Sequence, residues 1–347
     1  MDLEKSVSLP RSPAFLPPHC PRDACPSRLA RSPFRFQRKG RYRRECDQRV
    51  VQRFQCRACN HYFSTQSFRL DFRLHKPALH VLLFDTFVSK VTQRQAARNL
   101  ACTRKTVVHR LRLLAQHSRD FHGQVLERAR AGGGLRGDFQ LDELETFETS
   151  RRLCPVTMPV MIELHSYFVL HVEVAPLPPR GKPRRKELER RLERERAEGR
   201  RRSGSRDAVE RCFRVLASVR TSQPDLWIST DHKSTYGPLL RMVMPPVYHH
   251  ARHSSTARRD RANPLFPINH TLAMLRDGLS RLVRRSWGAS KRREWLERHA
   301  WVWIAYRNYI RPITNRARDT TSAMALGLVG KRFSKDAFFE WRVFPGA

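Results

Sequence analysis

The stretch GDFQLDELETFE, residues 137–148, carries an acid, Asp142, near its middle. We predict that it forms a short β-strand. Three glycines at 132–134 precede the stretch, and a second acid, Asp231, ends the apolar run 225–231. We expect the two carboxylates to act together as metal ligands, with the rest of the chain organised around the first strand.

The segments after this strand follow the order of a known α/β arrangement. Residues 156–164 and 167–174 are predicted strands, and the short turn between them favours an antiparallel hairpin. The later elements are predicted as a helix at 207–219, strands at 225–231 and 243–249, and helices at 268–285 and 292–309. This order is that of an RNase H-like domain, predicted over 136–315. In that fold the middle of the first strand lies beside the end of the fourth.

Asp142 and Asp231 are therefore predicted to face each other, although 89 residues separate them (231 − 142). Two carboxylates placed in this way can hold two Mg²⁺ (or Mn²⁺) ions for cleavage of a phosphodiester. The neighbouring acids are expected to be surface residues: Asp138 at the start of the strand, and Glu143, Glu145 and Glu148 further along it.

The charge of the chain indicates its partner. It has 68 Lys and Arg against 32 Asp and Glu, a formal net charge of +36, whereas a magnitude of about 2–8 is enough for solubility. Such a surplus favours a polyanion, and nucleic acid is the first candidate. No apolar run is long enough for a membrane span and no secretory signal is visible, so a reducing cytoplasm is expected. Residues 1–18, rich in Pro, Ser and Arg, are predicted to be a disordered lead-in.

Two pairs of cysteines predict a zinc ribbon at 19–68. Cys20 and Cys25 form a C-x4-C pair, and Cys56 and Cys59 form a C-x2-C pair. In a reducing compartment, close pairs favour a four-thiolate Zn²⁺ site over disulfides. The 30 residues between the pairs exceed the usual spacing, and Cys46 could replace one ligand.

A helix-turn-helix is predicted within residues 77–126. One helix covers 93–100, and a second begins at Arg104 after Thr103 as N-cap and ends near residue 116. A plain helical hairpin is the alternative, but the basic context favours DNA binding. The side chains expected to contact DNA here are those of Arg104, Lys105, His109 and Arg110.

Three further segments complete the organisation. Residues 128–137 are predicted to be a linker because of their glycines. The basic insertion 176–206 contains a charged helix at 184–202, expected to be a solvated helix or a mobile arm. The tail, 316–347, is expected to pack back onto the preceding domain.

Several motifs together resemble a known family. Leu141-Asp142-Glu143, Ser229-Thr230-Asp231-His232, and Asn269 followed by the Arg-rich block 275–291 are similar to DDE-type transposases of bacterial insertion sequences. The nearest group is the insertion-sequence-one-like set, with an N-terminal zinc ribbon and helix-turn-helix. The resemblance covers roughly residues 19–315.

This resemblance implies a third metal ligand seven residues before Arg276. That position holds Asn269 instead of the more frequent Glu, and some family members have Asn there. Asp277 should face away from this position, and Asp260 and His270 are poorer alternatives. Four arginines of the block are as well suited to phosphate contacts as to a solvated face: Arg276, Arg281, Arg284 and Arg285.

The resemblance implies a bacterial, nucleoid-associated transposase. It would bind the terminal inverted repeats of its element in double-stranded DNA and act as a homo-oligomer. It would nick the DNA with Mg²⁺ and transfer the freed strand. The alternatives are a non-catalytic zinc-ribbon and helix-turn-helix regulator, an inactive transposase copy, and an RNA-processing nuclease of the RNase H-like class.

Overall fold

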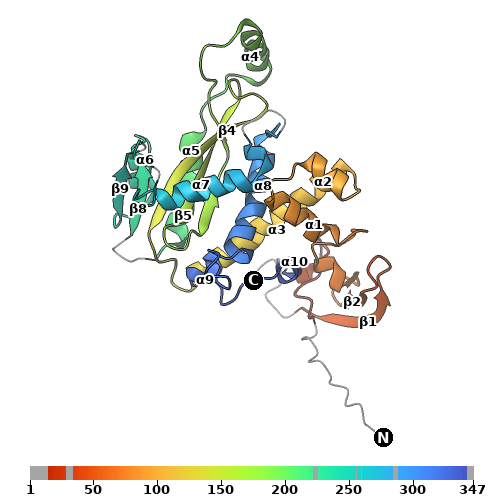
Figure 1. Ribbon diagram of the computed structural model, residues 1–347. Coiled ribbons are helices and arrows are strands. Elements are labelled where there is room, and N and C mark those ends of the chain that lie inside the picture. Colours follow the sequence, from red (N-terminus) through yellow and green to blue (C-terminus); the bar gives the residue numbers. More distant parts are fainter. Residues whose placement is uncertain are drawn as a thin grey trace. The chain divides into compact units, whose positions relative to one another are not determined.

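The computed structural model describes residues 15–28, 34–221, 226–254, 256–258, 260–283 and 288–341 (Figure 1). The chain divides into two compact units. The first contains Met1–Pro77 and Phe339–Ala347, and the second contains Ala78–Phe338. Within the described residues, no helix is both long and apolar enough to cross a membrane.

The first unit is a small antiparallel sheet. Its strands are β1 (Phe36–Arg43), β2 (Val50–Cys56) and β3 (Tyr62–Ser64), in that order, with short 3-10 turns at Pro26–Arg28 and Thr65–Phe68. The core consists of aromatic rings around the cysteines, with Phe54 and Cys56 of β2 and Phe63 of β3 buried in it. The rings that contact this core are those of Phe15, Phe34, Phe36, Phe54, Phe63 and Phe68.

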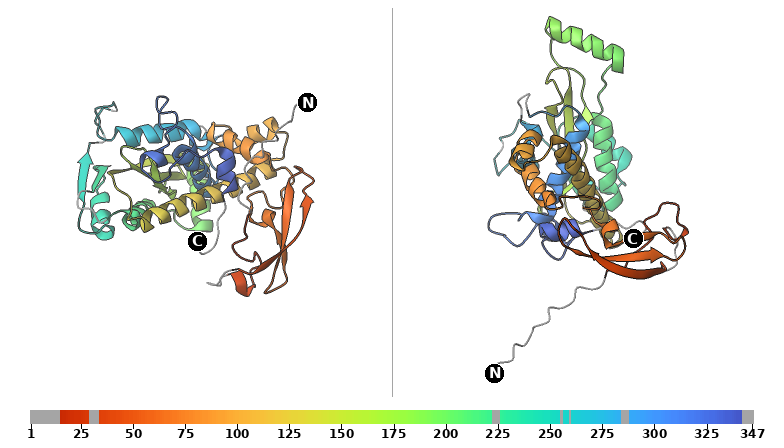
Figure 2. Two further views of the ribbon diagram at one scale, coloured as in Figure 1. Left: turned by 90° about the horizontal axis from the view of Figure 1, so that it is seen from below. Right: turned by 90° about the vertical axis from the view of Figure 1, so that its right-hand side faces the viewer.

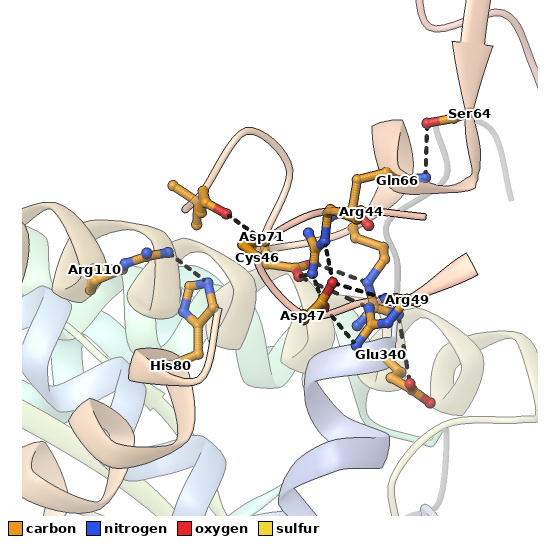
Figure 3. A network of polar contacts seen from close by, with 12 residues as sticks. Arg44, Cys46, Asp47, Arg49, Ser64, Gln66, Asp71, His80, Arg110 and Glu340 are labelled. Atoms are coloured by element: carbon orange, nitrogen blue, oxygen red, sulfur yellow. Dashed lines mark hydrogen bonds and ion pairs between the residues drawn. The ribbon is translucent and has the colours of Figure 1, made fainter. Parts of the chain in front are cut away.

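A polar network fastens the loop that follows this sheet (Figure 3). Asp71 is only 5% exposed and accepts hydrogen bonds from Arg44 at 2.7 Å, Arg69 at 2.9 Å and Gln66 at 3.0 Å. Burial alone would raise the pKa of Asp71, but the two arginines outweigh it and lower the pKa to about 2. The carboxylate therefore stays charged and holds the end of β1 against the loop.

The second unit contains a mixed sheet with the strand order β6-β5-β4-β8-β9. The antiparallel part is formed by β4 (Phe139–Phe147), β5 (Pro155–Glu163) and β6 (Val169–Val172), with the short β7 (Ala175–Pro176) also on β5. The strands β8 (Trp227–Asp231) and β9 (His249–His253) continue it in parallel from β4. The predicted adjacency of the first and fourth strands is therefore confirmed.

Helices cover both faces of this sheet (Figures 1 and 2). On one face α7 (Phe266–Gly278) and α8 (Arg293–Ala305) bury Leu144 of β4 and every second side chain of β5 in one core. These side chains of β5 are Val156, Met158, Val160 and Ile162. On the other face α5 (Ser205–Val219) and α6 (Tyr236–Val243) pack against the sheet. The charged α4 (Arg185–Glu198) has no buried residue and extends away from the sheet, as its composition predicted.

The helix-turn-helix pattern corresponds to α2 (Gln93–Asn99) and α3 (Arg104–Ala131), preceded by α1 (Leu79–Val88). Thr103 caps α3 by accepting a hydrogen bond from the Thr106 amide, as predicted. The predicted end of this helix near 116 is wrong, and the first four residues of the linker predicted at 128–137 belong to the helix, whereas residues 132–137 connect α3 to β4. The helix continues to Ala131 because Phe121, Val125 and Leu126 give it a buried face.

Two other boundaries also differ from the sequence prediction. The strand predicted at 243–249 is wrong: α6 ends at Val243, and β9 begins only at His249. Pro245 and Pro246 separate the two elements, since proline supplies no backbone N–H for a sheet ladder. The helix predicted at 268–285 ends at Gly278, followed by a 3-10 turn at Ser280–Leu282. The last helices are α9 (Ser322–Ala325) and α10 (Lys335–Glu340), with a π-helical turn at Tyr306–Ile310.

Part of the tail packs onto the second unit as expected. Phe338 is fully buried and its ring contacts those of His117 and Phe121, while Lys335 pairs with Asp85 at 2.6 Å. Phe344, another aromatic residue of the tail, lies outside the described residues.

Three buried histidines in the second unit make its stability sensitive to acid. His117, His122 and His299 each place Nε2 at 2.7–2.9 Å from a backbone carbonyl. A carbonyl only accepts, so Nε2 carries a proton in each of these rings. Burial lowers the pKa of His117 and His122 to about 4 and that of His299 to about 3.

We expect the second unit to lose stability as pH falls below about 6.5, where these histidines take up protons in the unfolded chain but not in the folded one. The slope should approach about 4 kcal/mol per pH unit for three groups between about pH 6.5 and 5. Urea titration followed by tryptophan fluorescence measures it. In His299→Gln the slope should fall by about a third, and an unchanged slope would contradict this assignment.

Candidate active site

The register of the sheet brings the two predicted acids to the same level. Phe139 pairs with Ile228 and Gln140 with Ser229 in the parallel ladder between β4 and β8. Two residues further along both strands stand Asp142 and Asp231. Their alignment follows from the strand order, which places the middle of β4 beside the end of β8.

Gln140 fixes the helix that covers this part of the sheet. Its side-chain amide donates to the carbonyl of Pro264 at 2.7 Å, and its oxygen accepts from the Ile268 amide at 3.0 Å. Gln140 lies two residues before Asp142 and so shares its face of the strand. The residue after Ile268 is Asn269, so this clamp sets the position of the predicted third ligand. Sequence reasoning missed Gln140, whose only signal was its spacing from Asp142.

A cavity of about 390 Å³ opens between β4 and α7. Asp142 lines it from the strand, and Asn269 and Arg276 line it from the helix, two turns apart on one side. Asp231 is not among the lining residues. The remaining walls are formed by Glu143, Phe266, His270, Leu272 and Ala273. Three of the predicted site residues are thus brought together around one cavity.

Asp231 nevertheless lies in the same electrostatic environment. Burial and then the negative charges of Glu143, Asp231 and Asp142 raise the pKa of the Tyr236 hydroxyl well above its usual value. All three carboxylates therefore act on one phenol. Asp231 also accepts a hydrogen bond from the Lys233 amide at 2.9 Å, which orients its side chain.

Glu143 is not the surface acid that the sequence predicted. Its side chain is 9% exposed and accepts from Thr157 at 2.6 Å, Ser205 at 2.8 Å and Tyr236 at 2.9 Å, and it forms an ion pair with Lys233. Burial alone would raise the pKa of Glu143, but Lys233 and the hydroxyl donors lower it below its usual value. The sequence of β4 did not predict the burial of Glu143, because α5 and α6 cover the face of the strand that carries this side chain.

The other acids of this strand lie as follows. Glu148 is also buried, paired with Arg201 at 2.9 Å and Arg293 at 3.4 Å, so its prediction as a surface residue is wrong. Glu145 is exposed as predicted and pairs with Arg180. Asp138 accepts from the Trp227 amide at 3.2 Å and thereby ties the start of β4 to β8.

We expect Glu143→Ala to destabilise the second unit by about 3 kcal/mol, because the hydroxyls of Thr157, Ser205 and Tyr236 lose their shared acceptor and the partly exposed Lys233 loses its counter-charge. Urea denaturation of the intact chain measures the loss. The matched control is Glu145→Ala, which breaks an exposed ion pair on the same strand and should cost about 1 kcal/mol or less. Equal losses in both variants would contradict the assigned role of Glu143.

The structure separates Asn269 from the alternative third ligands. Asp277 is 88% exposed and pairs with Lys90 at 3.5 Å, away from the cavity as predicted. Asp260 pairs with Arg258 at 3.5 Å. His270 lines the cavity beside Asn269, and burial with the charges of Arg307 and Arg311 lowers its pKa. Within the part of the chain that is described, no third acid or histidine joins Asp142 and Asp231 in a compact cluster.

The four predicted zinc ligands do form a compact cluster in the first unit. The ligand atoms of Cys20, Cys25, Cys56 and Cys59 all lie within 4.8 Å of one another. The Sγ atoms of Cys20 and Cys59 are 3.7 Å apart, as are those of Cys25 and Cys56. A tetrahedron with Zn–S bonds of about 2.3 Å requires S···S separations of about 3.8 Å. The cluster therefore has the donors and spacing to hold a zinc ion.

The four cysteines of this cluster differ in their surroundings: burial raises the pKa of the Cys20 and Cys25 thiols above the usual value. Burial alone would raise the pKa of Cys59, but a backbone hydrogen bond from His61 and the neighbouring cysteines lower it to about 7. Cys46, the alternative ligand, is exposed and lies outside the cluster, with its Sγ 4.0 Å from the Leu74 carbonyl. The spacing between the two pairs is bridged by β1 and β2, which return the chain to the first pair.

The predicted DNA-contacting residues of the helix-turn-helix divide into two groups. Arg104, Lys105 and His109 are exposed on the first turns of α3. Arg110 is only 3% exposed, and its guanidinium hydrogen bonds to His80 at 3.0 Å (Figure 3), so it packs inward rather than toward a ligand. In the helical pattern Arg110 lies at the edge of the apolar stripe of α3. The sequence was therefore compatible with either an exposed or a buried position for this side chain.

The arginines after Asn269 lie in different surroundings. Arg276 lines the cavity with Asp142, and Arg281 is mostly buried and donates to the Ser290 hydroxyl at 3.1 Å. Arg284 and Arg285 lie outside the described residues.

No protein-family model and no curated protein matches the chain. Solved structures show weak similarity. A simian T-cell lymphotropic virus intasome in complex with PP2A regulatory subunit B56 gamma has 13% identity over 71% of each chain, with a TM-score of 0.26. The Mos1 mariner paired end complex with Mn has 12% identity over 62% of this chain and 70% of that one, with a TM-score of 0.22. The catalytic domain of Mos1 mariner transposase has 14% identity over 56% and 90%, with a TM-score of 0.21. All three TM-scores lie below 0.5.

Proposed function

We propose that this chain is a DDE-type transposase, with Asn in the third position, built on an RNase H-like domain. The observation that supports it most is the alignment of Asp142 on β4 with Asp231 on the parallel neighbour β8. Asn269 lies across a cavity from Asp142, on a helix that Gln140 clamps to the same strand. The order of antiparallel and parallel strands agrees with the RNase H-like arrangement expected from the sequence.

The donor set suits a hard divalent cation. Asp142, Asp231 and Asn269 offer only oxygen atoms, which Mg²⁺ and Mn²⁺ prefer. When bound, such ions supply an activated water or 3′-hydroxyl and stabilise the leaving oxygen of a phosphodiester. Asn269 adds no negative charge, so the affinity for metal should be lower than with three carboxylates.

The surrounding residues have supporting roles in this proposal. Arg276 stands two turns from Asn269 in the same cavity and would bind the phosphate that is attacked. Glu143, held by Lys233, Tyr236 and Ser205, ties the end of β8 to the strand that carries Asp142. It would keep the two aspartates in place without binding metal itself.

The expected substrate is double-stranded DNA. The net charge of +36 suits a polyanion, and the exposed first turns of α3 suit a groove or phosphate backbone. The chain would recognise terminal inverted repeats, nick them by hydrolysis and join the freed 3′-hydroxyl to target DNA. Pairing two ends would require a homo-oligomer on DNA, in the nucleoid of a bacterial cytoplasm.

The test is strand cleavage of labelled duplexes that contain the DNA flanking this gene. Cleavage should require Mg²⁺ or Mn²⁺ and stop with EDTA. Specific binding without cleavage in either metal would instead favour the non-catalytic regulator. Cleavage limited to RNA or to RNA–DNA hybrids would favour an RNA-processing nuclease.

A further inference from the structure

A second cavity in the Ala78–Phe338 unit has the chemistry of an anion site. Its volume is about 620 Å³. Two parts of the unit form it: the starts of α2 and α3, and residues 280–281 and 288–295. The lining residues are Thr92, Gln93, Arg94, Arg104, Val108, Ser280, Arg281, Gly288, Ala289, Lys291 and Trp295.

The lining is entirely free of acids and rich in cations. Arg94, Arg104 and Lys291 are exposed, and among the described residues none of them forms an ion pair. Together with Arg281 they place four positive charges around one cavity without a carboxylate in its wall. Such an arrangement is repulsive unless an anion enters it.

Among these four cations, Arg281 gives the strongest indication that the cavity binds an anion. Burial lowers the pKa of its guanidinium to about 10, so the group remains charged at neutral pH. Within the described residues its hydrogen bond goes to the neutral hydroxyl of Ser290, at 3.1 Å, and no carboxylate pairs with it. A desolvated cation without a counter-charge is costly, and a bound anion would remove that cost.

Gln93 supplies an independent observation. Its Nε2 is buried and has no hydrogen-bond partner among the described residues, although the side chain belongs to the cavity wall. A buried donor without an acceptor is rare in folded proteins. Like the guanidinium groups of the arginines, this Nε2 group requires an acceptor.

We propose that this cavity binds a backbone phosphate of DNA, with Arg281 as the inner contact and Arg94, Arg104 and Lys291 around it. The phosphodiester is preferred over a free anion because one wall is the exposed start of α3, where a duplex would lie. The proposal rests on DNA being the partner of the proposed function, but it does not depend on cleavage.

The position of this cavity also connects DNA binding to the active site. Ser280 and Arg281 follow directly on α7, the helix that carries Asn269 and Arg276. The amide of Lys90, just before α2, donates to the carbonyl of Gly278 at 2.8 Å, and the ring of Trp303 lies 2.5 Å from where a Cβ on Gly278 would stand. The end of α7 is therefore packed tightly against the segment leading into the helix-turn-helix.

The experiment is fluorescence anisotropy of two unrelated labelled duplexes with the full chain in EDTA, over a range of salt concentrations. The variants are Arg281→Gln, Arg104→Gln and Lys291→Gln, with the exposed Arg316→Gln as a control of equal charge. Each cavity variant should weaken binding about tenfold or more on both duplexes. Each should also reduce the slope of log K against log salt by about one.

Unchanged affinity and slope in the three cavity variants would overturn the proposal, as would an equal loss in Arg316→Gln. If Arg281→Gln fails to fold by circular dichroism, the exposed Arg104 and Lys291 variants decide. Stabilisation of the wild type by inorganic phosphate, without any effect of these variants on duplex binding, would indicate a free-anion site and also overturn it. A wild-type chain that binds but does not cleave would contradict only the proposed function.

Discussion

Asp231→Ala is expected to reduce DNA strand cleavage on the order of 10³-fold or more while leaving DNA affinity unchanged. Asp142 and Asp231 each stand two residues beyond the last pair of the β4–β8 ladder, and both charges act on the Tyr236 hydroxyl. Removing either carboxylate would leave a single acid and Asn269, too few to hold the metal. Asp142→Ala should therefore have the same effect.

Cleavage of labelled duplexes with Mg²⁺ or Mn²⁺ measures this effect, and anisotropy in EDTA measures binding. The matched control is Asp138→Asn, on the same strand as Asp142. Its side-chain oxygen can still accept from the Trp227 amide, so the fold and the cleavage rate should be retained. Undiminished cleavage by both alanine variants would rule out this site as the nuclease centre.

Removal of zinc is expected to unfold the first unit and leave the second unit folded. The first unit has only a small core around the four cysteines, and a domain of that size cannot rely on apolar burial alone. Structural zinc contributes an apparent 10–16 kcal/mol in small zinc domains. Its loss should therefore abolish the protection of residues 34–65 in hydrogen exchange.

Hydrogen exchange with mass spectrometry, before and after chelation, follows both units in the intact chain. Zinc release measured alongside should give one ion per chain. Cys25→Ser should lose both the zinc and the protection. Cys46→Ser, which changes an exposed cysteine outside the cluster, should keep both. Preserved protection after complete zinc release would show that the metal is not needed for this fold.

The sequence predicted those features that depend on local pattern. The cysteine spacing identified the four sulfur atoms that meet, and the Thr103 cap identified the start of α3. The succession of strands was sufficient to place β8 beside β4. Each of these follows from a period or a pairing rule that operates within a few residues or along a sheet.

Features that depend on long-range packing were not predictable in the same way. Glu143 and Glu148 have the sequence signature of surface acids, yet α5, Arg201 and Arg293 cover them. Gln140 looked like an ordinary polar strand residue, and its role as a clamp depends on Pro264 and Ile268 more than 120 residues away. Arg110 and Arg281 are buried by partners that no local pattern indicates.

The length of α3 has a consequence for where a strand would be cut. The helix is continuous over 28 residues, about 42 Å at 1.5 Å per residue. Its first turns are exposed, and its later turns carry Phe121 and Val125 into the core of the same unit. The helix would therefore hold the recognised sequence at a fixed distance from the active site. Moving the recognised sequence by one base pair should then move the cleaved bond by one base pair.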